Sequence, residues 1–181
     1  MVVSLIGFMG CGKSSVGREL SSRLRCPFVD LDAELERRSD MSIAEIFARY
    51  GESEFRKREL ATLEEVLLRQ EDFILATGGG TPMIPEASAL LSGKTYCVYL
   101  RACALQLEEI LASLDNTNRP LLKTSSVTEL LRARVPVYER TAHLTLDISE
   151  FASGIPDANA FARMAGRLVL DIGKEKGFSG H

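Results

Sequence analysis

A glycine-rich segment near the N-terminus, Gly-Phe-Met-Gly-Cys-Gly-Lys-Ser at residues 7–14, constrains the fold of this chain most strongly. It matches the pattern G-x-x-x-x-G-K-[ST] without exception. An apolar run at Val2–Gly7 precedes it, and a stretch with apolar residues at helical spacing follows it. In such a strand–loop–helix unit, inward backbone N–H groups and the positive end of the helix bind phosphate. The alternative, a glycine-rich turn with a coincidental Lys-Ser pair, does not account for the flanking strand and helix.

Each part of this loop has a predicted role. The residues predicted to bind the phosphates of ATP are Gly10, Cys11, Gly12, Lys13, Ser14 and Ser15. Lys13 is expected to reach the β- and γ-phosphates and to act in catalysis, and Ser14 to give Mg²⁺ a hydroxyl ligand. Cys11 is either a tolerated small residue or a thiol with a lowered pKa, whose modification should inactivate the protein. The loop therefore predicts ATP and Mg²⁺ as cofactors.

Apolar, β-branched runs alternate with longer segments of helical period along the chain, which is typical of an α/β fold with a parallel sheet. The predicted strands are Val2–Gly7, Pro27–Leu31, Phe73–Thr77, Thr95–Leu100 and Leu144–Ile148. Capping boxes at Ser42 and Ser126 predict two helix starts, and Gly51 is expected to end the first of these helices. Further helices are predicted from Pro85 toward Leu91, over Glu52–Arg69 and over Ala158–Lys176, with a frayed tail at Gly177–His181.

The composition excludes several classes of protein. The 181 residues, 45% hydrophobic and 26% charged, fit one soluble domain. A net charge of −3 is not the basic balance of a nucleic-acid binder, and no apolar run approaches the ~20 residues that cross a bilayer. We therefore expect a cytoplasmic monomer with neither nucleic acid nor membrane as a partner.

The cysteines follow no known ligand or disulfide spacing. They are Cys11, Cys26, Cys97 and Cys103. The two histidines cannot complete a metal-ligand set with them, so the cysteines are predicted to be reduced, buried or semi-buried thiols.

Two aspartates end the second predicted strand, Asp30 and Asp32. Residues i and i+2 of a strand point to the same side, and the carboxyl ends of parallel strands border the ligand crevice. One of these carboxylates is predicted to hold Mg²⁺, directly or through water, and the other to bind or deprotonate an acceptor hydroxyl. The alternatives are a solvated strand end or a helix N-cap made by Asp32.

An arginine shares the apolar side of the helix predicted at Glu52–Arg69. Arg56 lies four residues before Leu60 of the apolar stripe, so it points toward the core, whereas Arg58 falls on the polar side. An inward guanidinium requires an anion, because an unpaired buried charge is costly. Glu59, three residues away, is placed to orient Arg56.

Arg134 repeats this arrangement in the helix after Ser126, where it extends the apolar stripe toward Tyr138. The pair Arg56 and Arg134 is predicted to receive a substrate carboxylate. Snorkelling arginines or internal salt bridges are the alternative, and the sequence leaves both interpretations open.

A triple glycine, Gly78-Gly79-Gly80, follows the third predicted strand. Without side chains, it allows a ligand to approach the backbone closely, and its N–H groups are predicted to bind a carboxylate. A flexible turn is the alternative. Further on, the polar segment Asp115–Ser125, interrupted by Arg-Pro-Leu-Leu from Arg119, is either a lid or an ordinary solvated connection.

Together these motifs resemble the shikimate kinases, which have the P-loop fold of the nucleoside-monophosphate kinases. The resemblance covers about Met1–Ile148. Its motifs are Gly-Phe-Met-Gly-Cys-Gly-Lys-Ser from Gly7, Phe-Val-Asp-Leu-Asp from Phe28, Gly-Glu-Ser-Glu-Phe-Arg from Gly51, Gly-Gly-Gly from Gly78, Arg-Pro-Leu-Leu from Arg119 and Arg-Val-Pro-Val-Tyr from Arg134. It implies a three-layer α/β/α domain over residues 1–181, with a five-stranded parallel sheet, a lid at about 114–125 and substrate-binding helices at about 32–60.

The resemblance also implies an activity, ATP-dependent phosphorylation of the 3-hydroxyl of shikimate. It implies that Asp32 and Arg119 are catalytic, that Arg119 also binds ATP as the lid arginine, and that Ser14 and Asp30 hold Mg²⁺. The implied shikimate-binding residues are Asp32, Arg56, Gly78, Gly79, Gly80 and Arg134. The chain departs from the family at the adenine end, since Cys103–Leu114 contains no basic residue and Ser149–Pro156 is extended.

Two other functions remain open from the residues alone. One is a kinase for another polyol acid or for a nucleoside monophosphate, although the two arginines and the triple glycine favour a carboxylate acceptor. The other is a nucleotide-binding regulatory protein, which would require a lost catalytic residue.

Overall fold

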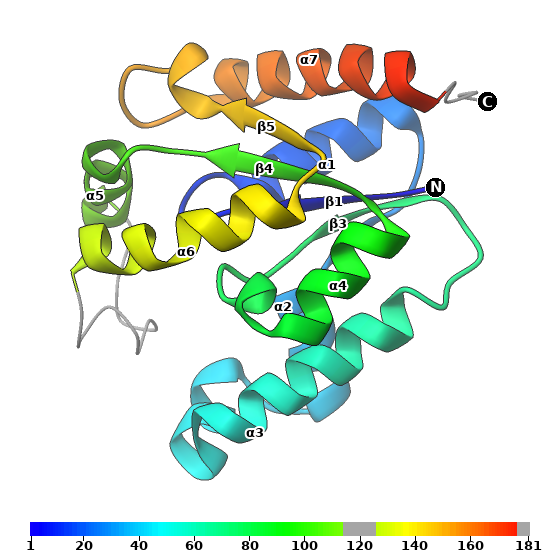
Figure 1. The fold of residues 1–181 in the computed structure, drawn as a ribbon, viewed down its shortest axis with the longest axis vertical. Coiled ribbons are helices and arrows are strands. Elements are labelled where there is room, and N and C mark those ends of the chain that lie inside the picture. Colours follow the sequence, from blue (N-terminus) through cyan, green and yellow to red (C-terminus); the bar gives the residue numbers. More distant parts are fainter. Residues whose placement is uncertain (114–125, 177–181) are drawn as a thin grey trace.

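Five parallel strands form a single sheet between layers of helices (Figure 1) in this computed structural model, which describes residues 1–113 and 126–176. The strands are β1 (Val2–Ile6), β2 (Phe28–Asp30), β3 (Phe73–Ala76), β4 (Tyr96–Arg101) and β5 (Leu144–Asp147). Their order across the sheet is β2-β3-β1-β4-β5. The five predicted strands and the parallel sheet are confirmed, with boundaries that differ by single residues.

The strands are apolar because helices cover both faces of the sheet. On one face, α1 (Lys13–Leu24) and α7 (Ala158–Lys176) pack on Val3 and Leu5 of β1. On the other, α3 (Ile43–Val66), α4 (Pro85–Lys94) and α6 (Val127–Thr141) share a core with Ile6. Figure 1 shows α1 and α7 above the sheet and α4 and α6 below it. The three-layer α/β/α arrangement is therefore confirmed.

The remaining described elements are short. The helix α2 (Leu31–Ser39) follows β2, α5 (Ala104–Ser113) follows β4, and the 3-10 turns η1 (Thr81–Met83) and η4 (Ile148–Glu150) follow β3 and β5. Because the strands are parallel, the segments after β1, β2 and β3 leave the sheet at the same edge. The glycine loop, the paired aspartates and the triple glycine are these segments. Among the described residues, no helix has the length and apolarity to cross a membrane.

The helix boundaries agree with the local signals in part. Both predicted capping boxes form, at Ser42 and at Ser126. Gly51 has non-helical dihedrals (φ 79°, ψ 176°), so the predicted end of the first helix is confirmed, and a second helical part of α3 begins directly after this kink. The helix expected to reach Arg69 ends at Val66, after which Leu68 N–H and Arg69 N–H donate to carbonyls three residues back in tighter turns.

Candidate active site

The glycine loop has the conformation that its pattern predicts. Gly10 and Gly12 have φ of 85° and 89°, values that favour glycine, and α1 begins directly after them. The Lys13 ammonium is buried and donates to the carbonyls of Gly7 and Phe8, both at 2.9 Å. Lys13 is thus held in place by its own loop, at the N-terminus of α1.

Of the two interpretations of Cys11, the structure favours the tolerated small residue. Its side chain is fully buried, and burial raises the pKa of the thiol although Lys13 opposes the rise. The alternative of a lowered pKa is therefore wrong, because desolvation outweighs the charge of Lys13. The side chain packs in the core beneath the loop, and Cys103 is the exposed thiol among the four free cysteines.

Ser14 and Asp30 come together at the foot of the loop. The Ser14 hydroxyl donates to Asp30 Oδ2 at 2.7 Å, and Asp30 Oδ1 accepts from the backbone of Asp32 and Ala33 as the N-cap of α2. Within residues 1–113 and 126–176, no group of three or more His, Cys, Asp or Glu side chains is arranged to hold a metal ion by itself. A hydroxyl and a carboxylate fit Mg²⁺, which keeps several waters and takes further oxygens from the phosphates it accompanies.

Asp32 lies in the first turn of α2 and not on the strand, so the predicted i, i+2 strand geometry is wrong. The chain turns into a helix after Asp30, and Asp30, not Asp32, is the N-cap. Burial raises the pKa of Asp32 to about 6, with further contributions from Glu59 and Asp30, while Lys13 lowers it. Asp32 nevertheless faces the cavity beside the loop, where the prediction requires a carboxylate.

Arg56 faces the same cavity and is anchored by acidic neighbours. Its Nη1 donates to Glu59 at 2.6 Å and its Nη2 to Glu52 at 3.2 Å. Glu59 is 1% exposed and also accepts a hydrogen bond of 2.5 Å from the Thr81 hydroxyl. Glu59 therefore makes the contact with Arg56 that its predicted orienting role requires. Arg56 forms salt bridges, as the alternative interpretation has it, and it also lines the cavity.

Arg134 is more deeply buried, and among the described residues it has no acidic partner, with the Tyr138 hydroxyl as its polar neighbour. It is 6% exposed, its guanidinium lies 5.3 Å from the centre of the Phe8 ring, and it lines the cavity. Its buried Nη1 has no hydrogen-bond partner among the described residues. A buried donor on a permanent cation favours an anionic ligand, because leaving the donor unpaired is costly.

The triple glycine contacts the side chains of the site. A Cβ on Gly78 would lie 2.8 Å from both Asp32 and Glu59, and one on Gly80 would lie 2.5 Å from Arg56 Nη2. None of the three glycines has a positive φ, so no special turn requires glycine at these positions. The close packing around them does. The carbonyl of Gly79 accepts a 2.5 Å hydrogen bond from the Tyr138 hydroxyl. Burial raises the pKa of Tyr138, which keeps this hydroxyl protonated as a donor.

These groups line a single cavity of about 760 Å³. The predicted site residues that line it are Gly10, Gly12, Lys13, Ser14, Ser15, Asp30, Asp32, Arg56, Gly78, Gly79, Gly80 and Arg134. Arg119 and the predicted lid at 114–125 lie outside the described residues. Sequence reasoning missed Phe47 and Phe55, whose rings lie 4.6 Å apart across the Gly51 kink and line the cavity.

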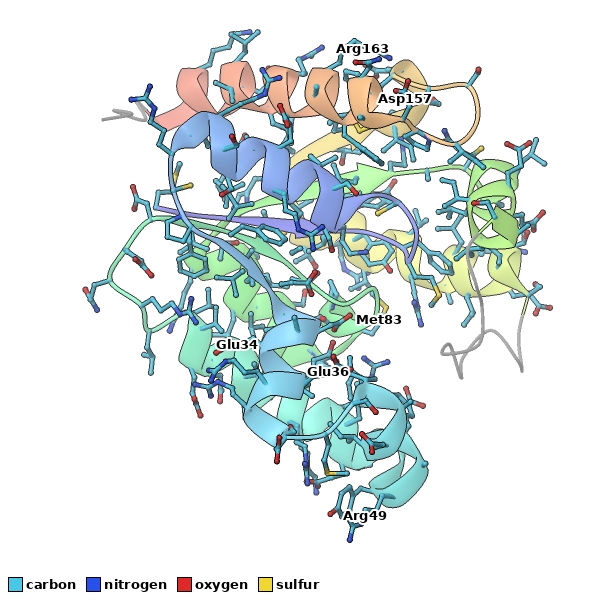
Figure 2. All side chains as sticks on the ribbon, turned by 180° about the vertical axis from the view of Figure 1, so that it is seen from behind. Glu34, Glu36, Arg49, Met83, Asp157 and Arg163 are labelled. Atoms are coloured by element: carbon cyan, nitrogen blue, oxygen red, sulfur yellow. The ribbon has the colours of Figure 1, made fainter. Side chains whose placement is uncertain are left out.

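The opposite end of the cavity is mostly apolar, and all of its lining residues but Phe161 come from Cys103–Leu114 and Ser149–Pro156, the segments named for the adenine end. It is lined by Ile110, Ser113, Ile155, Pro156 and Phe161. Phe161 of α7 packs on the glycine loop, since a Cβ on Gly12 would lie 2.7 Å from its ring. Figure 2 shows Asp157 and Arg163, at the start of α7, at the end of the molecule opposite Arg49 of α3. The cavity thus has one end near α7 and another beside α3.

Gln106 supports the apolar end. Its buried amide donates to the carbonyls of Ala152 at 3.0 Å and Gly154 at 2.9 Å, just before Ile155. The signal for Gln106 was available, because it lies four residues before the buried Ile110, as Arg56 lies before Leu60.

Comparisons with known proteins agree with this site. A family model described as shikimate kinase matches residues 9–164. A shikimate kinase of Thioalkalivibrio sulfidiphilus is 42% identical over 149 residues, 80% of this chain and 77% of the relative. One of Nitrosomonas europaea is 40% identical over 165 residues, 89% of this chain and 74% of the relative.

A solved structure, that of shikimate kinase from Acinetobacter baumannii in complex with shikimate, matches this structure with a TM-score of 0.83 and 31% identity over 97% of this chain and 94% of that one. Both sequence and structure therefore match over most of the chain. The chain belongs to the shikimate kinase family, whose ATP- and Mg²⁺-dependent enzymes transfer the γ-phosphate of ATP to the 3-hydroxyl of shikimate.

Proposed function

We propose that the cavity binds the shikimate carboxylate between Arg134 and Arg56 and the ATP phosphates at the glycine loop. The observation that carries this assignment is the buried Arg134 with its unpartnered Nη1 in the cavity wall. Arg56 adds a second guanidinium, held by Glu59 beside Gly80. Two guanidinium groups in a partly buried site select a carboxylate, which accepts their hydrogen bonds in pairs.

The reaction joins the two ends of the cavity. The 3-hydroxyl oxygen of shikimate forms a bond to the γ-phosphorus, the bond from that phosphorus to the β–γ bridging oxygen breaks, and ADP leaves. Asp32 is proposed to orient the hydroxyl and to accept its proton, and with a pKa of about 6 it is mostly ionised at neutral pH. Positioning and electrostatic stabilisation supply most of the catalysis in such transfers.

Lys13 is proposed to exchange its two loop carbonyls for the β- and γ-phosphates, so that its charge faces the transferred group. Ser14 and Asp30 are proposed to hold Mg²⁺, which neutralises phosphate charge when bound. The nucleotide contacts proposed for Gly10, Gly12 and Ser15 are made at the N-terminus of α1, where helical N–H groups favour anions.

Further proposals concern the lid and the state of the enzyme. Arg119 is proposed to close over the phosphates as part of a lid at 114–125, on the strength of its Arg-Pro-Leu-Leu motif. Excluding water in this way would suppress hydrolysis of ATP. The enzyme is also proposed to be a cytoplasmic monomer, and sedimentation at the protein concentration of the activity assay tests the monomeric state.

A substitution of Arg134 tests the carboxylate site. Arg134→Met keeps much of the side-chain volume and removes the charge, so the KM for shikimate should rise about 10- to 150-fold, the effect of losing a hydrogen bond to a charged group. The KM for ATP should stay the same. The measurement is ADP release with each substrate varied in turn.

Arg132→Met is the matched control, since Arg132 is an exposed arginine on the same helix. It should leave both constants unchanged. An unchanged shikimate KM in Arg134→Met would refute the assignment of the carboxylate site.

A further inference from the structure

Helix α6 makes a second contact with the substrate end of the cavity, through Tyr138. Tyr138 lies one helical turn after Arg134 and is fully buried. Its hydroxyl donates to the carbonyl of Gly79, 59 residues away in the sequence, at 2.5 Å. The contact therefore joins α6 to the triple glycine between β3 and η1.

The segment it holds is bonded at both ends to the turn that follows, because the Gly78 carbonyl accepts from Thr81 N–H and the Gly80 carbonyl from Met83 N–H. Gly78–Gly80 carries no side chains, and glycine is the residue with the most conformational freedom to lose. Each glycine lies against a part of the site: Gly78 against Asp32 and Glu59, Gly79 against the backbone of the glycine loop, and Gly80 against Arg56. A small shift of this backbone would displace the groups packed on it.

We propose that Tyr138 is a positioning residue for shikimate binding, which acts by fixing the peptide plane between Gly79 and Gly80. In a trans peptide the carbonyl and the following N–H point in opposite directions, so a bond to the Gly79 carbonyl also orients the Gly80 N–H. No hydrogen bond from that N–H to another described residue is present. Tyr138 thus leaves Gly80 N–H directed away from α6 and holds the backbone surface on which Arg56 rests. This inference rests on the carboxylate site proposed above.

The neighbouring Tyr99 provides a matched control. It lies on β4, its ring centre is 5.1 Å from that of Tyr138, and it is 1% exposed. Its buried hydroxyl has no hydrogen-bond partner within the described part of the chain. Tyr99→Phe and Tyr138→Phe therefore each remove one buried phenolic hydroxyl from the same layer of the core. Only Tyr138→Phe breaks the hydrogen bond to Gly79.

The test compares Tyr138→Phe with Tyr99→Phe by steady-state kinetics and by urea unfolding of each variant. Tyr138→Phe should raise the KM for shikimate about 2- to 10-fold, the net effect of one hydrogen bond, with the KM for ATP unchanged. Tyr99→Phe should leave both constants unchanged. A Tyr138→Phe enzyme that loses stability but keeps its shikimate KM would reduce the hydroxyl to a structural role and overturn the proposal.

The Arg134→Met variant distinguishes a failure of this inference from a failure of the carboxylate site on which it rests. If Arg134→Met weakens shikimate binding and Tyr138→Phe does not, the carboxylate site stands and the positioning role fails. If neither variant weakens it, both fail. In the Arg134→Met background, Tyr138→Phe should still raise the shikimate KM, and a loss of its effect there would show that the hydroxyl acts through Arg134 and not through Gly79.

Discussion

Asp32 combines two demands at a single residue. It must be ionised to accept a proton, yet burial, and then the charges of Glu59 and Asp30, raise its pKa to about 6. Lys13 is the nearby cation that opposes this rise. A carboxylate with such a pKa is a stronger base than an exposed aspartate, at the expense of folding stability.

The folding stability that is lost through ionised Asp32 can be measured with Asp32→Asn in the absence of Mg²⁺ and ligands. The folded-state pKa of about 6 exceeds the unfolded value of 3.8, so the folded state binds the proton more tightly, and ionised Asp32 destabilises it at neutral pH. Asp32→Asn should therefore be more stable than the parent protein above pH 6, by about 1–3 kcal/mol. The gain should disappear below pH 4, where Asp32 is protonated in both states.

Urea unfolding in EDTA across this pH range is the measurement. Glu71→Gln, at an exposed position, is the control and should show no such dependence. A constant difference between Asp32→Asn and the parent at all pH values would show that the pKa of Asp32 is not raised. The Asp32→Asn enzyme should also lack kinase activity.

At the scale of elements, the kink in α3 decides what the helix contributes to the site. The part before Gly51 carries Phe47 and the part after it carries Phe55 and Arg56, and all three residues line the cavity. A straight helix would rotate these two parts relative to each other, because its side chains repeat every 3.6 residues. Gly51 therefore allows two short helical faces to surround one end of the cavity.

Replacing Gly51 with alanine tests the importance of this kink. Nothing lies within 4 Å of a Cβ at Gly51, so the effect of the change comes from the backbone, whose φ of 79° is unfavourable for alanine. Gly51→Ala should destabilise the protein by about 1–3 kcal/mol. It should also raise the KM for shikimate but not for ATP, because Phe47 would be displaced.

Gly173→Ala in α7 is the control, since a Cβ there also meets open space and the backbone is helical. It should stabilise the protein by about 0.5–1 kcal/mol. If Gly51→Ala behaved like Gly173→Ala in stability and in kinetics, the kink would have no role in the site.

At the scale of the whole molecule, the cavity depends on packing on both faces of the sheet. On one face, α7 packs on α1, the helix that begins in the glycine loop, and Phe161 of α7 lies against Gly12. On the other, α3 and α6 bring Arg56 and Arg134 to the same cavity. The loss of α7 packing should therefore affect the whole fold, because it shares a core with β1 and α1.

Two leucines of α7 test this dependence. Leu168 is fully buried, whereas Leu170, two residues later, is 63% exposed. Leu168→Ala should reduce the free energy of unfolding by about 2–5 kcal/mol, through lost burial and the cavity that remains. Leu170→Ala should change it by no more than about 0.5 kcal/mol. Equal effects of the two substitutions in urea unfolding would contradict the observed orientation of α7.

The sequence alone determined the features that depend on near neighbours along the chain. The glycine loop, the two capping boxes and the inward direction of Arg56 and Arg134 follow from short patterns, since backbone angles and helical spacing are local properties. The strands followed from their apolar runs, because helices bury both faces of the sheet.

The tertiary structure alone decided which of these residues meet and in what environment. Spacing placed Asp32 on a strand, and the sequence left a lowered pKa of Cys11 as one alternative. In the fold the chain turns into α2 after Asp30, and burial beneath the loop raises the pKa of the Cys11 thiol. The bond between Tyr138 and Gly79 spans 59 residues. Burial and long-range contacts depend on how separate elements pack, and no pattern within one element records the neighbour that another will supply.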